Sequence, residues 1–126
     1  MRFFSRPSKP PNGPPTDEQA VILHLKLADD DFGPPGEVEA LNRLGDSFRS
    51  VVDSAGIGEY DGNEFGAGWG VFWLYGPSAD SIADAVTPLV LSASPRAGSY
   101  IVRRYGGVET PRAAERRQDI GTPPLN

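Results

Sequence analysis

The sequence predicts an α+β fold of the ferredoxin-like kind, a βαββαβ sandwich with a four-stranded antiparallel sheet and two helices on one face. Two observations predict it. An alternating strand and a long amphipathic helix precede an aromatic, glycine-rich block over residues 58–76, and a second helix and a final strand follow it. Right-handed crossovers would place the first strand between the third and the fourth, with the second strand at an edge.

Composition divides the 126 residues into one domain and two tails. Residues 1–18 contain five prolines, and residues 106–126 carry glycines and prolines around the charged run Glu115-Arg116-Arg117. Such segments lack the apolar groups that a packed element needs, so we expect flexible tails over 1–18 and 106–126. The predicted domain covers residues 19–105.

The first predicted element is a half-buried strand over residues 21–27. Its apolar residues, among them Leu23 and Leu25, alternate with His24 and Lys26. An acidic loop rich in proline and glycine follows.

Two helices are predicted from apolar residues at steps of three and four. The first covers residues 37–55, and Gly56 is placed to end it. The second covers residues 79–92, with Ser78 as its N-cap. Pro88 lies inside this second helix, so we expect a bend or early fraying there.

The aromatic block predicts a β-hairpin. Its second strand, over residues 69–75, alternates clearly, whereas its first strand, over about 57–61, is weaker. Glycines within residues 61–68, including the pair Asp61-Gly62, supply the turn. The final strand is expected over residues 99–105.

Charge and composition limit the classes of partner. The net charge is −5, and residues 19–105 carry six basic and twelve acidic side chains, a net charge of −6. An acidic body disfavours nucleic acid, whose phosphates need clustered cations, and fits a basic protein partner. The chain has no cysteine. It has no stretch long and apolar enough to span a membrane, so we expect a cytoplasmic protein without a membrane partner.

Alternation along the strands predicts a sheet face without helices that is unusually aromatic. Phe72 and Leu74 would face the helices, and the tryptophans would face away from them. Such a face is seldom bare in a monomer, so we expect self-association through it, with a small-ligand groove as one alternative. A reversed register that buries the tryptophans in the core is the other alternative. The predicted ligand or interface residues are Ile22, His24, Trp69, Val71, Trp73, Tyr75 and Arg103.

Acidic residues in two loops raise the alternative of a divalent metal site. If both loops lie at one end of the sheet, their carboxylates would converge with Arg96 nearby, and hard cations prefer several such oxygens. The spacing matches no calcium-loop pattern, and water solvates acids at loop tips, so we expect no cofactor. The candidate metal ligands are Asp29, Asp30, Asp31, Asp61 and Glu64.

His24 is the one histidine of the chain and a candidate general base, with Arg103 or Tyr105 as expected neighbours. The sequence contains no nucleophile elbow, phosphate loop or dinucleotide fingerprint. We therefore expect a binding or interaction protein that forms dimers. A small enzyme that uses His24 or the acidic loops is the alternative.

Three stretches carry a resemblance to a family. They are G-E-Y-D-G-N-E-F-G, the strand end L-Y-G-P-S-A-D and the later R-R-Y-G. Over about residues 57–105 the chain resembles small uncharacterised bacterial proteins with a ferredoxin-like fold. The resemblance implies that fold and carries no activity.

Overall fold

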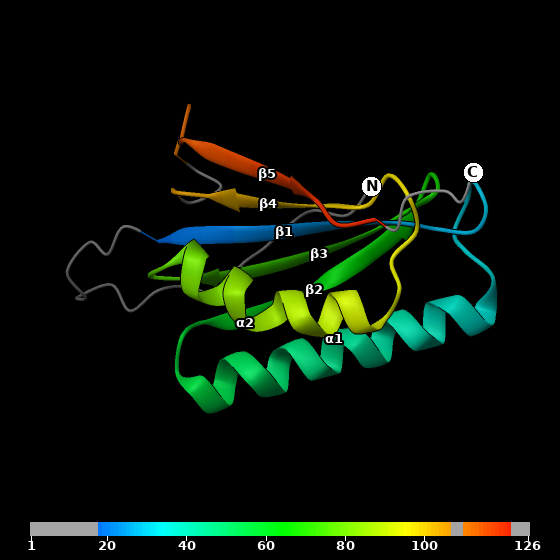
Figure 1. Cartoon of the computed structure of the whole chain (residues 1–126), viewed down its shortest axis with the longest axis horizontal. Coiled ribbons are helices and arrows are strands. Elements are labelled where there is room, and N and C mark those ends of the chain that lie inside the picture. The colour runs from blue at the N-terminus through cyan, green and yellow to red at the C-terminus, as the bar shows by residue number, and fades with distance from the viewer. Residues whose placement is uncertain (1–17, 107–109, 122–126) are drawn as a thin grey trace.

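The computed structural model describes residues 18–106 and 110–121, and it has an α+β architecture (Figure 1). Five antiparallel strands form one sheet in the order β2-β3-β1-β4-β5, and both helices lie on the same side of it. Except for Glu18, the predicted N-terminal tail lies outside the described residues. In chain order the elements are β1 (Gln19–Lys26), α1 (Pro35–Ala55), β2 (Glu59–Gly66), β3 (Trp69–Gly76), α2 (Ala79–Ser92), β4 (Tyr100–Arg104) and β5 (Glu115–Asp119).

The predicted placement of the first four strands is confirmed. β1 lies between β3 and β4, and β2 lies at one edge. The core fills the space between sheet and helices, where the apolar positions of β1 and β3 meet those of α1 and α2. Its largest fully buried members include Phe48, Phe72, Leu23, Leu74 and Ile82.

The fifth strand corrects the predicted four-stranded sheet, and it lies within the predicted tail over residues 106–126, of which the structure describes 106 and 110–121. β5 pairs with β4 over five residues and forms the second edge of the sheet. Four of its five residues are exposed, so its sequence shows no apolar alternation. Pairing through the backbone, which the side-chain pattern does not report, holds this strand in place.

The turn of the hairpin lies at the end of the predicted range, residues 61–68. β2 continues to Gly66, and the reversal uses Ala67 and Gly68, whose φ angles are 52° and 83°. Two consecutive positive φ angles are typical of the two-residue turn that suits the twist of paired strands. The first strand of the hairpin is therefore longer than the predicted 57–61, and the pair Asp61-Gly62 lies at a bulge, where the register shifts between Tyr60 and Gly62.

Both helix ends that the sequence marked are confirmed. Gly56 ends α1 in the left-handed conformation, with φ of 65°. The hydroxyl of Ser78 accepts a hydrogen bond from the Ser81 N–H at 3.1 Å at the start of α2. The second helix continues beyond Pro88 to Ser92, so the expected early fraying does not occur. In the described part of the chain, neither helix is long and apolar enough to cross a membrane.

Candidate functional site

The helix-free face is the side of the sheet opposite the two helices. Because Leu23, Phe72 and Leu74 point into the core, their strand neighbours point the other way. The register then places Ile22 opposite both Trp73 and Val102, and His24 opposite both Val71 and Tyr100. The predicted orientation of the tryptophans away from the helices is therefore confirmed. The central strands supply Ile22, His24, Lys26, Trp69, Val71, Trp73, Tyr75, Tyr100, Val102 and Arg104 to this face.

One predicted member of this face lies on the other side of the sheet. Arg103 follows the buried Ile101 at an interval of two, so it shares the helix side with it. Its side chain is 10% exposed, and its guanidinium donates to Asp80 at 3.0 Å and to Asp84 at 3.1 Å. The expectation that Arg103 lies on the helix-free face next to His24 is wrong, because its neighbours in β4, Val102 and Arg104, occupy that face instead.

Arg103 instead forms an ion-pair network with the first turns of α2. The Tyr105 hydroxyl donates to the same carboxylate oxygen of Asp80 at 2.7 Å. The hydrogen bonds from Tyr105 and Arg103 hold the pKa of Asp80 below its ordinary value, and the bond to Asp80 raises the pKa of Tyr105. This network joins β4 to α2, so its evident role is to fix the helix on the sheet.

An aromatic and cationic cluster occupies one end of the helix-free face. The His24 and Tyr100 rings stack at 4.4 Å between centroids with an angle of 13° between their planes. The edge of Trp69 packs against both rings, at 6.2 Å from His24 and 5.8 Å from Tyr100. The guanidinium carbon of Arg117 lies 3.6 Å from the centroid of Tyr100, and the Lys26 ammonium lies 5.7 Å from that of Trp69. We call these five residues the ring cluster.

The ring cluster sets the charge state of His24. Burial, and then the positive charge of Arg117, lower the pKa of its imidazole below 6.5. His24 is therefore neutral at pH 7. The described residues offer it ring contacts and no hydrogen-bonded carboxylate that would orient it as a general base. Its role in an enzyme stays a prediction without supporting geometry.

Tyr75 is a predicted interface residue that is not accessible. It lies opposite Ala20 on the helix-free face, yet its exposed fraction is 1% and that of Ala20 is 0%. The accessible part of the face is therefore at the other end, near Ile22, Val71 and the ring cluster, where the side chains are half-buried except for the exposed Arg117.

The acidic residues that the alternative metal site would need do not converge. Asp29 uses its carboxylate to accept the N–H groups of Asp31 at 2.9 Å and Gly33 at 3.0 Å, which shapes its own loop. The hairpin tip does reach this loop, since Gly68 N–H donates to the Asp31 carbonyl at 2.7 Å. Because the turn lies at 67–68, however, Asp61 and Glu64 lie back along β2.

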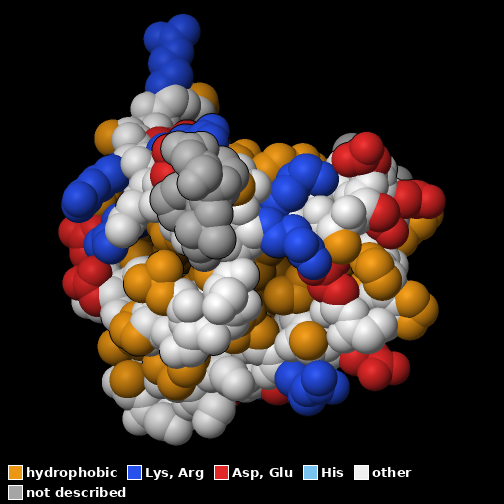
Figure 2. Space-filling view, turned by 45° about the vertical axis from the view of Figure 1, so that its right-hand side comes forward, with side chains coloured by type: hydrophobic (Ala, Val, Ile, Leu, Met, Phe, Trp, Pro, Cys, Tyr) orange, Lys and Arg blue, Asp and Glu red, His pale blue; other side chains and the backbone are white. Residues whose placement is uncertain are grey.

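No group of three or more potential metal ligands occurs within the described residues. Acidic side chains still gather near one end of the molecule, where basic side chains lie next to them (Figure 2). Arg96, which was expected near the candidate metal ligands, pairs with Glu37 instead. Its Nε donates to a Glu37 carboxylate oxygen at 3.0 Å, and the other oxygen of Glu37 accepts the Ala28 N–H at 2.8 Å.

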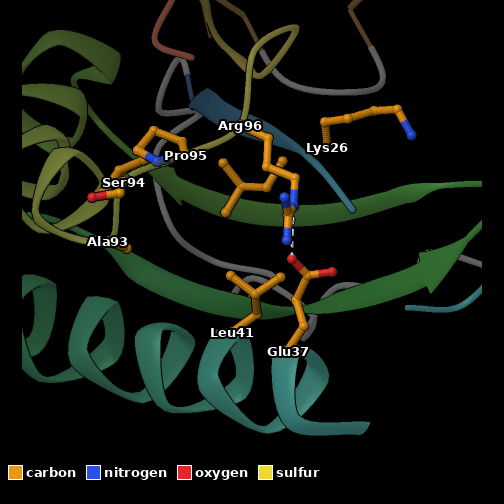
Figure 3. Close-up of a pocket in the computed structure, with 9 residues that line it drawn as sticks. Lys26, Glu37, Leu41, Ala93, Ser94, Pro95 and Arg96 are labelled. Atoms are coloured by element: carbon orange, nitrogen blue, oxygen red, sulfur yellow. Dashed lines mark hydrogen bonds and ion pairs between the residues drawn. The ribbon is translucent and has the colours of Figure 1, made fainter. Parts of the chain in front are cut away.

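The same ion pair closes a small pocket between the helices (Figure 3). The side chains of Arg96 and Glu37 point toward one another at its mouth, whereas Lys26 points away. Its cavity volume is about 210 Å³. This is below the range of about 300–1,000 Å³ that is typical of ligand pockets. The lining residues are Leu25, Lys26, Glu37, Leu41, Val90, Ala93, Ser94, Pro95 and Arg96.

Comparisons with protein-family models, with curated proteins and with solved structures found no match for this chain. The candidate sites are therefore judged on their own geometry. Of these, the helix-free face offers the largest set of accessible apolar and aromatic groups.

Proposed function

We propose that the protein is a small binding module whose helix-free face pairs with the same face of a second copy. The proposal depends on one observation, an apolar patch formed by Ile22, Val71 and Val102 on three neighbouring strands. All three side chains keep part of their surface exposed, and the helices lie on the other side of the sheet. Pairing two such patches would remove apolar surface from water around a two-fold axis.

We infer further that the domain is ferredoxin-like, with one added strand. The order β2-β3-β1-β4, with helices after β1 and β3, is that of a split βαβ sandwich. β5 extends this sheet beyond β4 and brings Arg117 over Tyr100. In this interpretation the added strand completes the ring cluster and so forms one border of the pairing face.

The subunit count tests the proposal directly. We expect light scattering to give twice the chain mass of 13.5 kDa at high concentration and a lower mass on dilution. Both tryptophans of the chain lie on the helix-free face, so their fluorescence reports on this surface alone. Emission should shift to shorter wavelength as the dimer forms, because association removes water from the indole rings.

A matched pair of variants locates the interface. Val71→Lys combined with Val102→Lys places two charges in the apolar patch and should give a monomer at every concentration. Leu91→Lys places one charge on an aliphatic residue of α2 that is 53% exposed, and it should leave the dimer intact. A wild-type protein that is monomeric throughout, or a dimer that Leu91→Lys dissociates equally well, would refute the proposal.

A further inference from the structure

β5 is the last strand of the sheet, and no other strand within residues 18–106 and 110–121 pairs with its outer edge. Tyr105 N–H donates to the Ala114 carbonyl at 2.9 Å, and Ile120 N–H donates to the Ser99 carbonyl at 3.0 Å. Backbone groups of an antiparallel strand alternate in direction, so those of Arg116 and Gln118 also point toward β4. The N–H and C=O groups of Glu115, Arg117 and Asp119 therefore point outward, away from the sheet.

Cationic side chains border this edge on both faces of the sheet. Arg116 lies on the helix side, opposite Arg103, and Arg117 lies on the helix-free side, opposite Val102. Arg117 contacts Tyr100 and lies 3.4 Å from Asp119. Arg116 is exposed and makes no hydrogen bond or ion pair with the residues that the structure describes. The edge thus offers backbone hydrogen bonds together with one arginine on each face, of which Arg117 is already paired with Asp119.

The charge of this region is opposite to that of the rest of the chain. Residues 18–95 carry thirteen acidic and three basic side chains, a net charge of −10. The described residues from Arg96 onward, 96–106 and 110–121, carry six basic and two acidic side chains, a net charge of +4. Arg96, Arg103 and Arg104 already pair with acidic side chains, so Arg116 and Arg117 are the cations of β5 that an acidic partner would meet.

We propose that β5 is a docking edge for an extended acidic segment of a partner protein, which adds to the sheet as a sixth strand. The outward groups of Glu115, Arg117 and Asp119 would pair with the backbone of the segment. Acidic side chains at two successive positions of the segment would lie opposite Arg116 and Arg117, one on each face. This surface is distinct from the helix-free face and does not depend on the pairing of two copies.

Two other occupants fit the edge less well. Pairing β5 with β5 of a second copy would bring two regions of charge +4 together while both acidic regions stay apart. A nucleic acid would meet the arginines, but its phosphates offer no donors to the outward carbonyl groups. The alternation of donors and acceptors along the edge is matched by another polypeptide strand.

Fluorescence anisotropy with a synthetic peptide tests the inference. The probe is fluorescein-labelled acetyl-STVEEVTS-amide, and the two matched controls are STVKKVTS and STPEEPTS, whose prolines remove two backbone donors. We expect saturable binding of the first peptide by the full chain and none of either control. Replacing both arginines, Arg116→Gln with Arg117→Gln, should weaken binding about two- to thirtyfold. Arg43→Gln with Arg49→Gln removes the same charge from α1 and should leave binding unchanged.

A second variant separates strand addition from simple charge attraction. Glu115→Pro removes one outward N–H and one negative charge, and proline is tolerated at the first residue of an edge strand. Strand addition predicts weaker binding of the acidic peptide, whereas charge attraction alone predicts stronger binding. Melting curves of each variant confirm that it is folded.

Three results would overturn the inference. The first is stronger binding to Glu115→Pro. The second is tighter binding of a labelled single-stranded oligonucleotide than of the acidic peptide. The third is a mass that rises with concentration in the wild-type protein and no longer does so in the Arg116 and Arg117 variant. That result would show that a second copy of the chain occupies the edge. None of these depends on whether the Val71 and Val102 variant dissociates a dimer, so the two proposals fail separately.

Discussion

Gly45 lies in the middle of α1, where the ring of Tyr60 leaves no space for a side chain. A Cβ placed there would lie 2.5 Å from the hydroxyl oxygen of Tyr60 and 3.0 Å from the Cζ atom of that ring. The ring has little freedom to move, since Tyr60 is 8% exposed and its hydroxyl accepts a hydrogen bond from the Asn63 amide at 2.8 Å. Phe48 packs against the same ring at 6.1 Å. Gly45→Ala must therefore displace Tyr60 or the helix.

The expected magnitude is the difference between two opposing effects. Alanine in place of glycine in a helix interior contributes about 1 kcal/mol through propensity. Forcing an extra methyl group into a packed core costs about 1–3 kcal/mol. We expect Gly45→Ala to lower the free energy of unfolding by up to about 2 kcal/mol. Gly36→Ala lies in the first turn of the same helix with no atom within 4 Å of its new Cβ, so it should be neutral or stabilising by up to about 1 kcal/mol.

Urea unfolding of the two variants measures this contrast. A double-mutant cycle with Tyr60→Phe identifies the contact, because removing the hydroxyl should recover part of the loss in the Gly45→Ala background. If Gly45→Ala is as stable as Gly36→Ala, the close approach of α1 to β2 is wrong and the reasoning fails.

Three further predictions test other parts of the structure. Because the pKa of His24 is lower in the folded protein than in the unfolded chain, the unfolded chain binds a proton on this ring more readily. The stability that the neutral ring contributes is therefore fully present above pH 6.5 and is lost as the pH falls through the folded-state pKa. The slope of unfolding free energy against pH in this range should be smaller in His24→Gln. Replacing both partners of Arg103, Asp80→Asn with Asp84→Asn, should destabilise the fold by more than the sum of the single variants, because only the double variant leaves the largely buried guanidinium without a charged partner. Additive single and double effects in thermal melts would contradict this. At the hairpin tip, Ala67→Gly should raise the free energy of unfolding by up to about 1 kcal/mol, since φ is 52°, whereas Gly68→Ala should lower it; equal effects of the two would argue against the turn.

The sequence was sufficient for the elements that bury an apolar face. Strand alternation around Leu23 and Phe72 and the helical spacing of the residues near Phe48 reflect the core directly, so their orientations were predictable. The ends of α1 and α2 were predictable because Gly56 and Ser78 satisfy backbone groups locally. These features depend on neighbouring residues alone.

What could not be predicted depends on contacts between distant residues. The hairpin offered several glycines as turn candidates, and only the pairing of β2 with β3 selects Ala67-Gly68. Arg103 was placed on the wrong face because β4 is short and both of its faces carry arginine. The acidic residues of the two loops would converge only if Asp61 and Glu64 lay at the hairpin tip, whereas the turn at Ala67-Gly68 leaves both within β2.

The contacts within the ring cluster disfavour the stacking of nucleobases on the helix-free face. A nucleobase needs a free aromatic face on which to stack. His24 stacks on Tyr100, while Arg117 lies over the same tyrosine and Lys26 over Trp69. Because these rings and cations already contact one another, the cluster contributes stability and shape more readily than base recognition. Two kinds of group are then left for a partner: the aliphatic side chains of the helix-free face, and the outward backbone groups of β5 with their flanking arginines. Both kinds of group favour a protein as the partner.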